Sequence, residues 1–138
     1  MECFMSIKKT EIAARPAEAA ELLKSVIEGE GMHVDCLIDH ASVLREAGIT
    51  PVDAYTLLFS SAKISSRLLL KNSEIALDIP LRIAVVNEGG RTLLVYRDMH
   101  PLLSSYQGAG MVDVINSVNG LTDSVVQTAV RRARGNSV

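Results

Sequence analysis

Residues 53–98 decide the fold, and they read DAYTLLFSSAKISSRLLLKNSEIALDIPLRIAVVNEGGRTLLVYRD. Short apolar runs rich in strand-forming residues occur three times in this stretch, at residues 55–59, 82–86 and 92–96. The Asn-Glu-Gly-Gly-Arg segment at 87–91 holds residues that tolerate positive φ, so a tight turn should pair the last two runs antiparallel. Pro80 cannot donate to a strand ladder and marks the entry to the second run. One helix is expected between the first two runs.

Upstream of this stretch, the spacing predicts a helix that starts at Pro16 and ends at Gly29 to Gly31. Its apolar positions recur on one face: Ala19, Leu22, Leu23, Val26 and Ile27. Residues 33–39 alternate like a strand, with Val34, Cys36 and Ile38 assigned to the core face. Residues 3–12 are a weaker candidate for a first strand. Asp39 is placed to cap a short helix that Gly48 stops.

Downstream, residues 102–110 read as a loop with at most one helical turn. A helix from Met111 is expected to break at Asn119-Gly120, after which Thr122 caps a last helix. The arginines at 131, 132 and 134 then lie at a helix C-terminus, where cations suit the helix dipole.

These elements predict an α+β fold, with a mainly antiparallel sheet of four to five strands and helices packed largely on one face. A chain of 138 residues with 48% hydrophobic residues is expected to form one domain over residues 1–138. A net charge of −2 and only five aromatic residues (three Tyr, two Phe) argue against nucleic-acid binding. The sequence has no run long enough to span a membrane and no signal-peptide pattern, so a cytoplasmic protein with reduced Cys3 and Cys36 is expected.

The order and spacing of these segments resemble the bacterial and archaeal family called domain of unknown function 302. The similar features are the strand, the small polar turn with Lys, the helix, Leu-Asp-Ile-Pro-Leu-Arg at 77–82, and the closing hairpin. Ile-Asp-His-Ala at 38–41 and Ala-Gly-Ile at 47–49 extend the resemblance upstream. It implies a small α+β fold, often dimeric, without an established reaction. The family commonly has Gly-Asn-Pro-Lys where this chain has Ser-Ser-Ala-Lys at 60–63, so a role that needs that Asn is not expected here.

Two polar segments are candidates for chemistry. Asp39-His40 places an imidazole beside a carboxylate at a strand end, where His40 could act as a base or a ligand. The competing interpretation is that Asp39 only caps a helix. Ser60, Ser61 and Lys63 stand at a strand-to-helix junction, where free N–H groups, hydroxyls and a cation could hold a carboxylate or phosphate. Ordinary capping by Ser60 or Ser61 explains the same pattern.

Two other motifs give weaker evidence for a binding site. A metal site built from His33, Asp35 and Asp39 is disfavoured, because a solvent-facing strand explains the same alternation more simply. Gly108-Ala109-Gly110 lacks the third glycine and the preceding strand of a dinucleotide fingerprint. Neither a metal nor a cofactor is therefore assigned.

Three functions remain open from the sequence. The first is a non-catalytic binder of a small, anionic ligand, with Asp39, His40, Ser60, Ser61 and Lys63 near one site. The second is a structural or assembly subunit that acts through its interface. The third is an enzyme that uses His40 as acid or base. So short a chain with this many apolar residues should leave some hydrophobic surface for a partner. Together with the resemblance, this predicts a homodimer.

Overall fold

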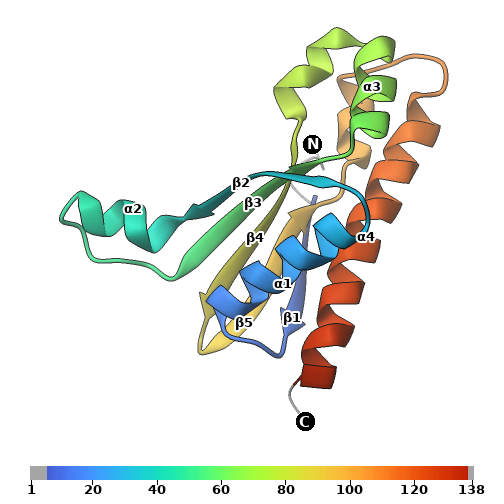
Figure 1. Cartoon of the computed structure of the whole chain (residues 1–138). Helices are drawn as coiled ribbons and strands as arrows, with labels where there is room; N and C mark the ends of the chain where they lie inside the picture. Colours follow the sequence, from blue (N-terminus) through green and yellow to red (C-terminus); the bar gives the residue numbers. More distant parts are fainter. Residues whose placement is uncertain (1–5, 137–138) are drawn as a thin grey trace.

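The computed structural model describes residues 6–136 and shows an α+β fold built on one five-stranded antiparallel sheet (Figure 1). The strand order is β1-β5-β4-β3-β2. The elements in chain order are β1 (Ile7–Ile12), α1 (Pro16–Gly29), β2 (His33–Asp39), α2 (His40–Glu46), β3 (Ala54–Ser60), α3 (Ala62–Lys71), η2 (Ser73–Asp78), β4 (Leu81–Glu88), β5 (Arg91–Arg97), η3 (His100–Ser104) and α4 (Met111–Asn136).

The β4–β5 hairpin lies at the centre of the sheet and confirms the predicted turn. Ile83 pairs with Tyr96, and Glu88 pairs with Arg91 at the turn. Gly89 and Gly90 have φ values of 60° and 82°, a conformation that favours glycine. The Asn87 side chain closes the turn by accepting a 3.1 Å hydrogen bond from the Gly90 N–H. Local turn chemistry therefore sets the register of the two central strands.

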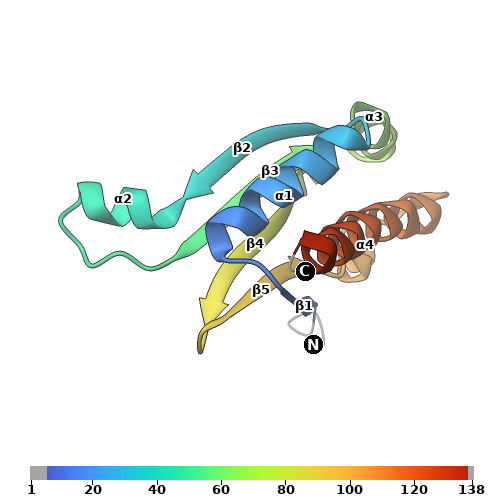
Figure 2. The same cartoon turned by 60° about the horizontal axis from the view of Figure 1, so that its bottom comes forward.

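One face of the sheet carries the core. Alternate residues of the central strands are fully buried on this face: Leu57, Phe59, Ile83, Val85 and Leu94. Helices α1 and α4 pack side by side over them, as Figures 1 and 2 show. Both helices present the apolar faces that their periodicity predicts, including Leu23 and Ile27 of α1 and Val125 and Ala129 of α4. The prediction of helices largely on one face is confirmed.

The opposite face of the sheet is covered by neither α1 nor α4. The pleat directs Thr56, Arg82, Ala84, Val95 and Arg97 to this side. Both arginines are exposed, and the other three residues are half-buried. We call it the uncovered face.

The β2–β3 hairpin carries α2 away from the rest of the molecule, so that residues 39–53 form a projecting segment that we call the α2 arm (Figure 1). Asp39 caps α2, because its Oδ1 accepts a 3.2 Å hydrogen bond from the Ser42 N–H. Within the helix itself only Ala41 is buried.

Strand β2 departs from the predicted facing. Cys36 is an exposed free thiol, not a core residue, and Leu37 packs against the core opposite Leu57. The register shifts between Val34 and Cys36, and such an irregularity reverses the faces of the residues that follow it. Cys3, and with it the first part of the predicted strand at 3–12, lies outside the described residues.

The C-terminal region is one helix rather than two. Helix α4 runs unbroken from Met111 to Asn136, and Thr122 does not cap a new helix. Its Oγ1 donates instead to the Val118 carbonyl one turn earlier, at 3.0 Å. Buried apolar residues on both sides of Asn119-Gly120 pack on the same core, and this packing outweighs the low helix propensity of Gly.

The helix after β3 is also divided. Helix α3 ends at Lys71, and Asn72 caps the separate 3₁₀ helix η2 by accepting a 2.9 Å hydrogen bond from the Glu74 N–H. Among residues 6–136, no helix is long and apolar enough to cross a bilayer.

Burial predicts a sharp contrast between two leucines. Leu57 is 0% exposed in the sheet, and Leu77 of η2 is 82% exposed. We expect Leu57→Ala to lower the free energy of unfolding by about 2–5 kcal/mol, because it leaves a cavity in the core. The matched control Leu77→Ala should change it by about 0.5 kcal/mol or less. Urea unfolding followed by circular dichroism measures both, and equal effects would contradict the described core.

Candidate functional site

A cleft of about 450 Å³ is lined mainly by residues of the uncovered face, and Leu81, Tyr96 and Thr122 of α4 complete its lining. Its volume is in the range of small-molecule sites, roughly 300–1,000 Å³. The floor comes from three neighbouring strands and includes Thr56 of β3, Arg82 and Ala84 of β4, and Val95 and Arg97 of β5. We call this feature the sheet cleft.

Connecting segments form the walls at the end of the cleft where β4 begins and β5 ends. Asp78 and Pro80 come from the connection that leads into β4. Met99 and Leu102 come from the segment that follows β5. Ile7 of β1, which pairs with Arg97, adds an apolar side chain that is 51% exposed. The cleft therefore combines charged groups with an apolar lining.

Arg82 and Arg97 are direct cross-strand neighbours in the floor. Ile83 pairs with Tyr96, so the next position of the antiparallel register sets Arg82 opposite Arg97 on the uncovered face. Like charges directly opposite each other destabilise a sheet. This pair is therefore an unfavourable arrangement that the fold retains.

No carboxylate of residues 6–136 forms an ion pair with either arginine. Arg97 Nη1 donates to Ser6 Oγ at 2.8 Å, and Arg82 makes no hydrogen bond within the described residues. Lys9 and Arg91, basic residues of the same face, are each paired: Lys9 with Glu88 at 3.6 Å and Arg91 with Glu11 at 3.4 Å. The floor of the sheet cleft thus carries two arginines that form no ion pair within residues 6–136.

Asp78 supplies a negative charge in the cleft wall. Its Oδ2 accepts a 2.5 Å hydrogen bond from the hydroxyl of Tyr106, a buried residue. This hydrogen bond, followed by burial, raises the pKa of Tyr106, so the phenol stays protonated and acts as the donor. Tyr106 therefore fixes the orientation of the Asp78 carboxylate.

The predicted pair Asp39-His40 divides between two tasks. Asp39 caps α2, as described above. His40 Nε2 lies 2.8 Å from Thr56 Oγ1, and Thr56 is part of the cleft floor. His40 thus reaches the sheet cleft through the Thr56 hydroxyl.

The second predicted group lies elsewhere. Ser61 caps α3, since its Oγ accepts a 3.4 Å hydrogen bond from the Ile64 N–H, and Lys63 is exposed in the first turn of that helix. Strand β3 sets His33 opposite Ser60 at one end and Asp39 opposite Tyr55 at the other.

The length of β3 therefore separates the two predicted groups. The five steps from Tyr55 to Ser60 span about 17 Å of extended chain. The structure thus places Asp39 and His40 at one end of β3, and Ser60, Ser61 and Lys63 at the other. Ligand binding by either group alone stays a prediction.

The residues of the disfavoured metal site are also dispersed. His33 Nε2 lies 3.6 Å from Asp35 Oδ1, whereas the Asp39 carboxylate is engaged as the cap of α2. Across residues 6–136, no three His, Cys, Asp or Glu side chains gather closely enough to hold a metal ion.

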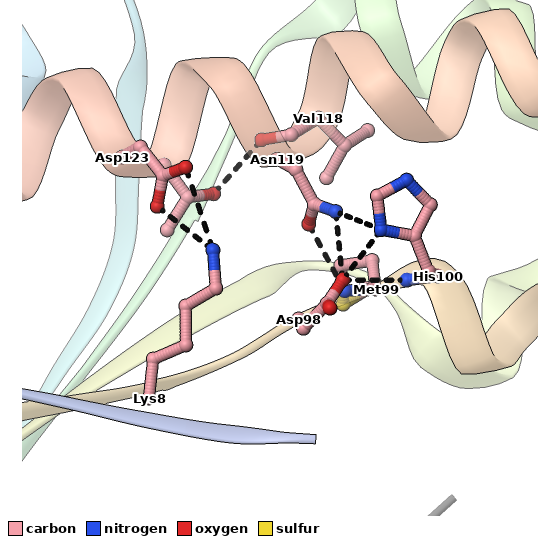
Figure 3. A network of polar contacts seen from close by, with 8 residues as sticks. Lys8, Asp98, Met99, His100, Val118, Asn119 and Asp123 are labelled. Atoms are coloured by element: carbon pink, nitrogen blue, oxygen red, sulfur yellow. Dashed lines mark hydrogen bonds and ion pairs between the residues drawn. The ribbon is translucent and has the colours of Figure 1, made fainter. Parts of the chain in front are cut away.

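A second polar cluster joins the end of β5 to the middle of α4 (Figure 3). Asp98 Oδ1 accepts hydrogen bonds of 2.9 Å from both the backbone N–H and Nδ1 of His100, and one of 2.8 Å from Asn119 Nδ2. His100 Nε2 lies 2.7 Å from Asn116 Oδ1. Asn119 Oδ1 in turn accepts from the Met99 N–H at 2.9 Å.

Protonation of His100 suits this cluster. Each ring nitrogen lies near an acceptor oxygen, and Asn119 Nδ2 also lies 3.1 Å from Nδ1. The hydrogen bond to Asn116 followed by that to Asp98 raises the pKa of His100. The backbone hydrogen bond from His100 contributes most to lowering the pKa of Asp98. Since both ring nitrogens are hydrogen bonded, His100 is not free to act as a general base. The cluster instead links the end of β5 to α4.

The residues of the sheet cleft were missed by the motif analysis, although a signal for two of them exists. Arg82 lies seven residues before the Gly89-Gly90 turn and Arg97 seven residues after it, so a hairpin with this two-residue turn sets them opposite each other. Asp78 has no such signal, because its place in the wall depends on Tyr106, which is distant in the sequence.

Comparisons with known proteins address the fold. The model of the family described as "Domain of unknown function DUF302" matches residues 8–129. The crystal structure of an uncharacterized conserved DUF302 protein from Bacillus stearothermophilus is similar, with a TM-score of 0.78 and 16% sequence identity. That match covers 94% of this chain and 98% of the other chain. No curated protein shows significant similarity.

The His100 cluster predicts a pH dependence of stability. The pKa of His100 is higher in the folded chain than in the unfolded one, so its contribution is complete below the unfolded value of about 6.5 and is lost as the pH rises through the folded pKa. We expect the free energy of unfolding to fall less between pH 6 and pH 8 in His100→Gln than in the wild type. The difference should be small, because the imidazole is 48% exposed.

Urea unfolding at several pH values measures this difference. Asp98→Asn serves as a second variant, because it removes the carboxylate partner and should flatten the same window. If the free energy of unfolding changes with pH equally in all three proteins, the role of the His100 cluster in stability is contradicted.

Proposed function

The chain belongs to the DUF302 family, and we propose that it is a non-catalytic, cytoplasmic protein that binds a small anionic ligand in the sheet cleft. The observation that carries this proposal is the cross-strand pair Arg82 and Arg97, whose guanidinium groups form no ion pair with a carboxylate of the described residues. The exposed free thiol of Cys36 agrees with a reducing compartment.

An anion between the two guanidinium groups would relieve the repulsion between them. Guanidinium is planar, is always charged, and donates paired hydrogen bonds to carboxylate or phosphate oxygens. Ser6 holds one of the two guanidinium groups, so part of the ordering needed for binding is already present in Arg97. Arg82, which is exposed and without a hydrogen bond within the described residues, is the freer donor.

The apolar lining favours an organic anion over an inorganic one. Ile7, Ala84, Val95 and Leu102 surround the charged groups, and a bare inorganic ion would leave this surface in water. Burial of an aliphatic segment would contribute favourable free energy in proportion to its area.

The same geometry supports catalysis less well than it supports ligand binding. An acid or base needs a free nitrogen within hydrogen-bonding reach of the substrate. His40 Nε2 is hydrogen bonded to Thr56, and His100 is bonded at both ring nitrogens. We therefore place the enzyme hypothesis below ligand binding.

Removal of either arginine should weaken anion binding. We expect Arg82→Ala and Arg97→Ala each to reduce the affinity for hexanoate at least about tenfold, since a charge-assisted hydrogen bond contributes roughly 1.5–3 kcal/mol. Isothermal titration calorimetry measures the affinity. Arg91→Ala is the matched control, because Arg91 lies on the same strand and face but is paired with Glu11.

Two outcomes would contradict the proposed site. If Arg91→Ala weakens binding as much as the two cleft variants do, the effect is one of overall charge. If hexanoate does not bind the wild type at millimolar concentrations, the cleft is not a site for aliphatic anions.

We further propose that the chain forms a homodimer through the α2 arm. Three apolar side chains of the arm are largely exposed: Val43 at 57%, Ile49 at 56% and Val52 at 61%. The arm projects beyond the sheet, and neither α1 nor α4 covers it (Figure 2). Exposed apolar surface gathered on one projecting segment is typical of a protein–protein contact.

Charge placed on the arm should disrupt such a dimer. We expect the double variant Val43→Asp, Val52→Asp to shift the protein from two chains to one in native mass spectrometry at micromolar concentrations, because a desolvated carboxylate opposes association. Val112→Asp is the matched control, since Val112 is 53% exposed on α4, away from the arm. A wild-type mass of one chain across micromolar concentrations would contradict the homodimer.

A further inference from the structure

We propose that the ligand of the sheet cleft is an aliphatic amino carboxylate, with its carboxylate on Arg82 and Arg97 and its ammonium on Asp78. This inference rests on the proposed function and specifies the class of ligand. It follows from the presence of both signs of charge in one cleft, held apart by the structure.

The opposite charges of the cleft do not neutralise each other. Within the described residues, Asp78 forms no ion pair with Arg82 or Arg97, although all three line the same cleft. Asp78 lies four residues before Arg82, a chain distance of at most about 14 Å. The Asp78 carboxylate and the arginine guanidinium groups, which we call the two poles of the cleft, are therefore near enough for one small molecule to reach both.

Each pole has a support outside the cleft floor. Tyr106 donates to Asp78 from the loop before α4, and Ser6 accepts from Arg97 at the start of β1. These hydrogen bonds oppose a collapse of the carboxylate onto the arginines. The cleft consequently presents an acceptor at one place and donors at another, which matches a ligand with an ammonium and a carboxylate at opposite ends.

The lining between the poles fits a short chain of methylene groups. Ala84 and Val95 lie side by side in the floor, and Met99 and Leu102 stand in the wall. A hydrocarbon segment can bury itself against these side chains.

The Asp78 carboxylate supplies the discrimination. A monocarboxylate without an amine would satisfy the arginines but would cover Asp78 without giving its free lone pairs a donor. An unpaired buried polar group is a strong penalty against the wrong ligand. Preference for the amine-bearing compound is therefore the property that the site should show.

Three compounds of equal chain length isolate the two poles: 6-aminohexanoate, hexanoate and hexylamine. By calorimetry at neutral pH we expect 6-aminohexanoate to bind the full chain about tenfold more tightly than hexanoate, and hexylamine to bind more weakly than 6-aminohexanoate. Asp78→Asn keeps the shape and an acceptor for Tyr106, and it should bring the affinity for 6-aminohexanoate down to that for hexanoate. Arg91→Ala should leave the preference unchanged.

The outcomes separate the two proposals. If hexanoate binds through the arginines and 6-aminohexanoate binds no better, the ligand class is wrong and the anion site stands. If none of the three binds, both proposals fall. The comparison on the unmodified chain decides the question even if Asp78→Asn does not fold, and a preference that persists in a folded Asp78→Asn overturns the role of Asp78.

Discussion

The register of the β4–β5 hairpin is the constraint on which the rest of the structure depends. With Glu88 opposite Arg91, the residues Ile83, Val85 and Leu94 face the helices, while Arg82 and Arg97 meet on the other side. A shift of one residue would exchange the two faces, bringing the arginines under α1 and α4 and the core residues into water. Burial of the core and exposure of the charged pair are thus set by one turn.

Elements that depend on short-range signals were predictable, and elements that depend on distant packing were not. The turn at residues 87–91, the helix from Pro16 and the cap at Asp39 follow from neighbouring residues, and the structure contains each of them. The break predicted at Asn119-Gly120 is absent, because packing of α4 on the core outweighs local propensity. The irregularity after Val34 likewise has no local signal, so the facing of Cys36 was predicted wrongly.

The candidate site shows the same limit more strongly. Asp39 and Ser61 are polar residues at the ends of strands, which made them candidates for a site. In the structure both are N-caps of helices. Nothing in their spacing reveals that the whole length of β3 lies between them. The Asp98–Asn119 contact joins residues 21 apart, and the Asp78–Tyr106 contact joins residues 28 apart, so neither can be read from a motif. Only the arginine pair was implicit in the sequence, through the symmetry of the hairpin.

The two faces of the sheet differ in what they contribute to stability. Helices α1 and α4 cover one face, and the burial of that apolar surface is the main favourable term in folding. The uncovered face can therefore retain an unfavourable pair of like charges without loss of the fold, because its contribution to stability is small beside the core. Ser6 accepts a hydrogen bond from Arg97 and Tyr106 donates one to Asp78, so both charged side chains are held in place. For the proposed anion site, this order would reduce the conformational entropy lost on binding, and an anion would relieve the repulsion between the two arginines.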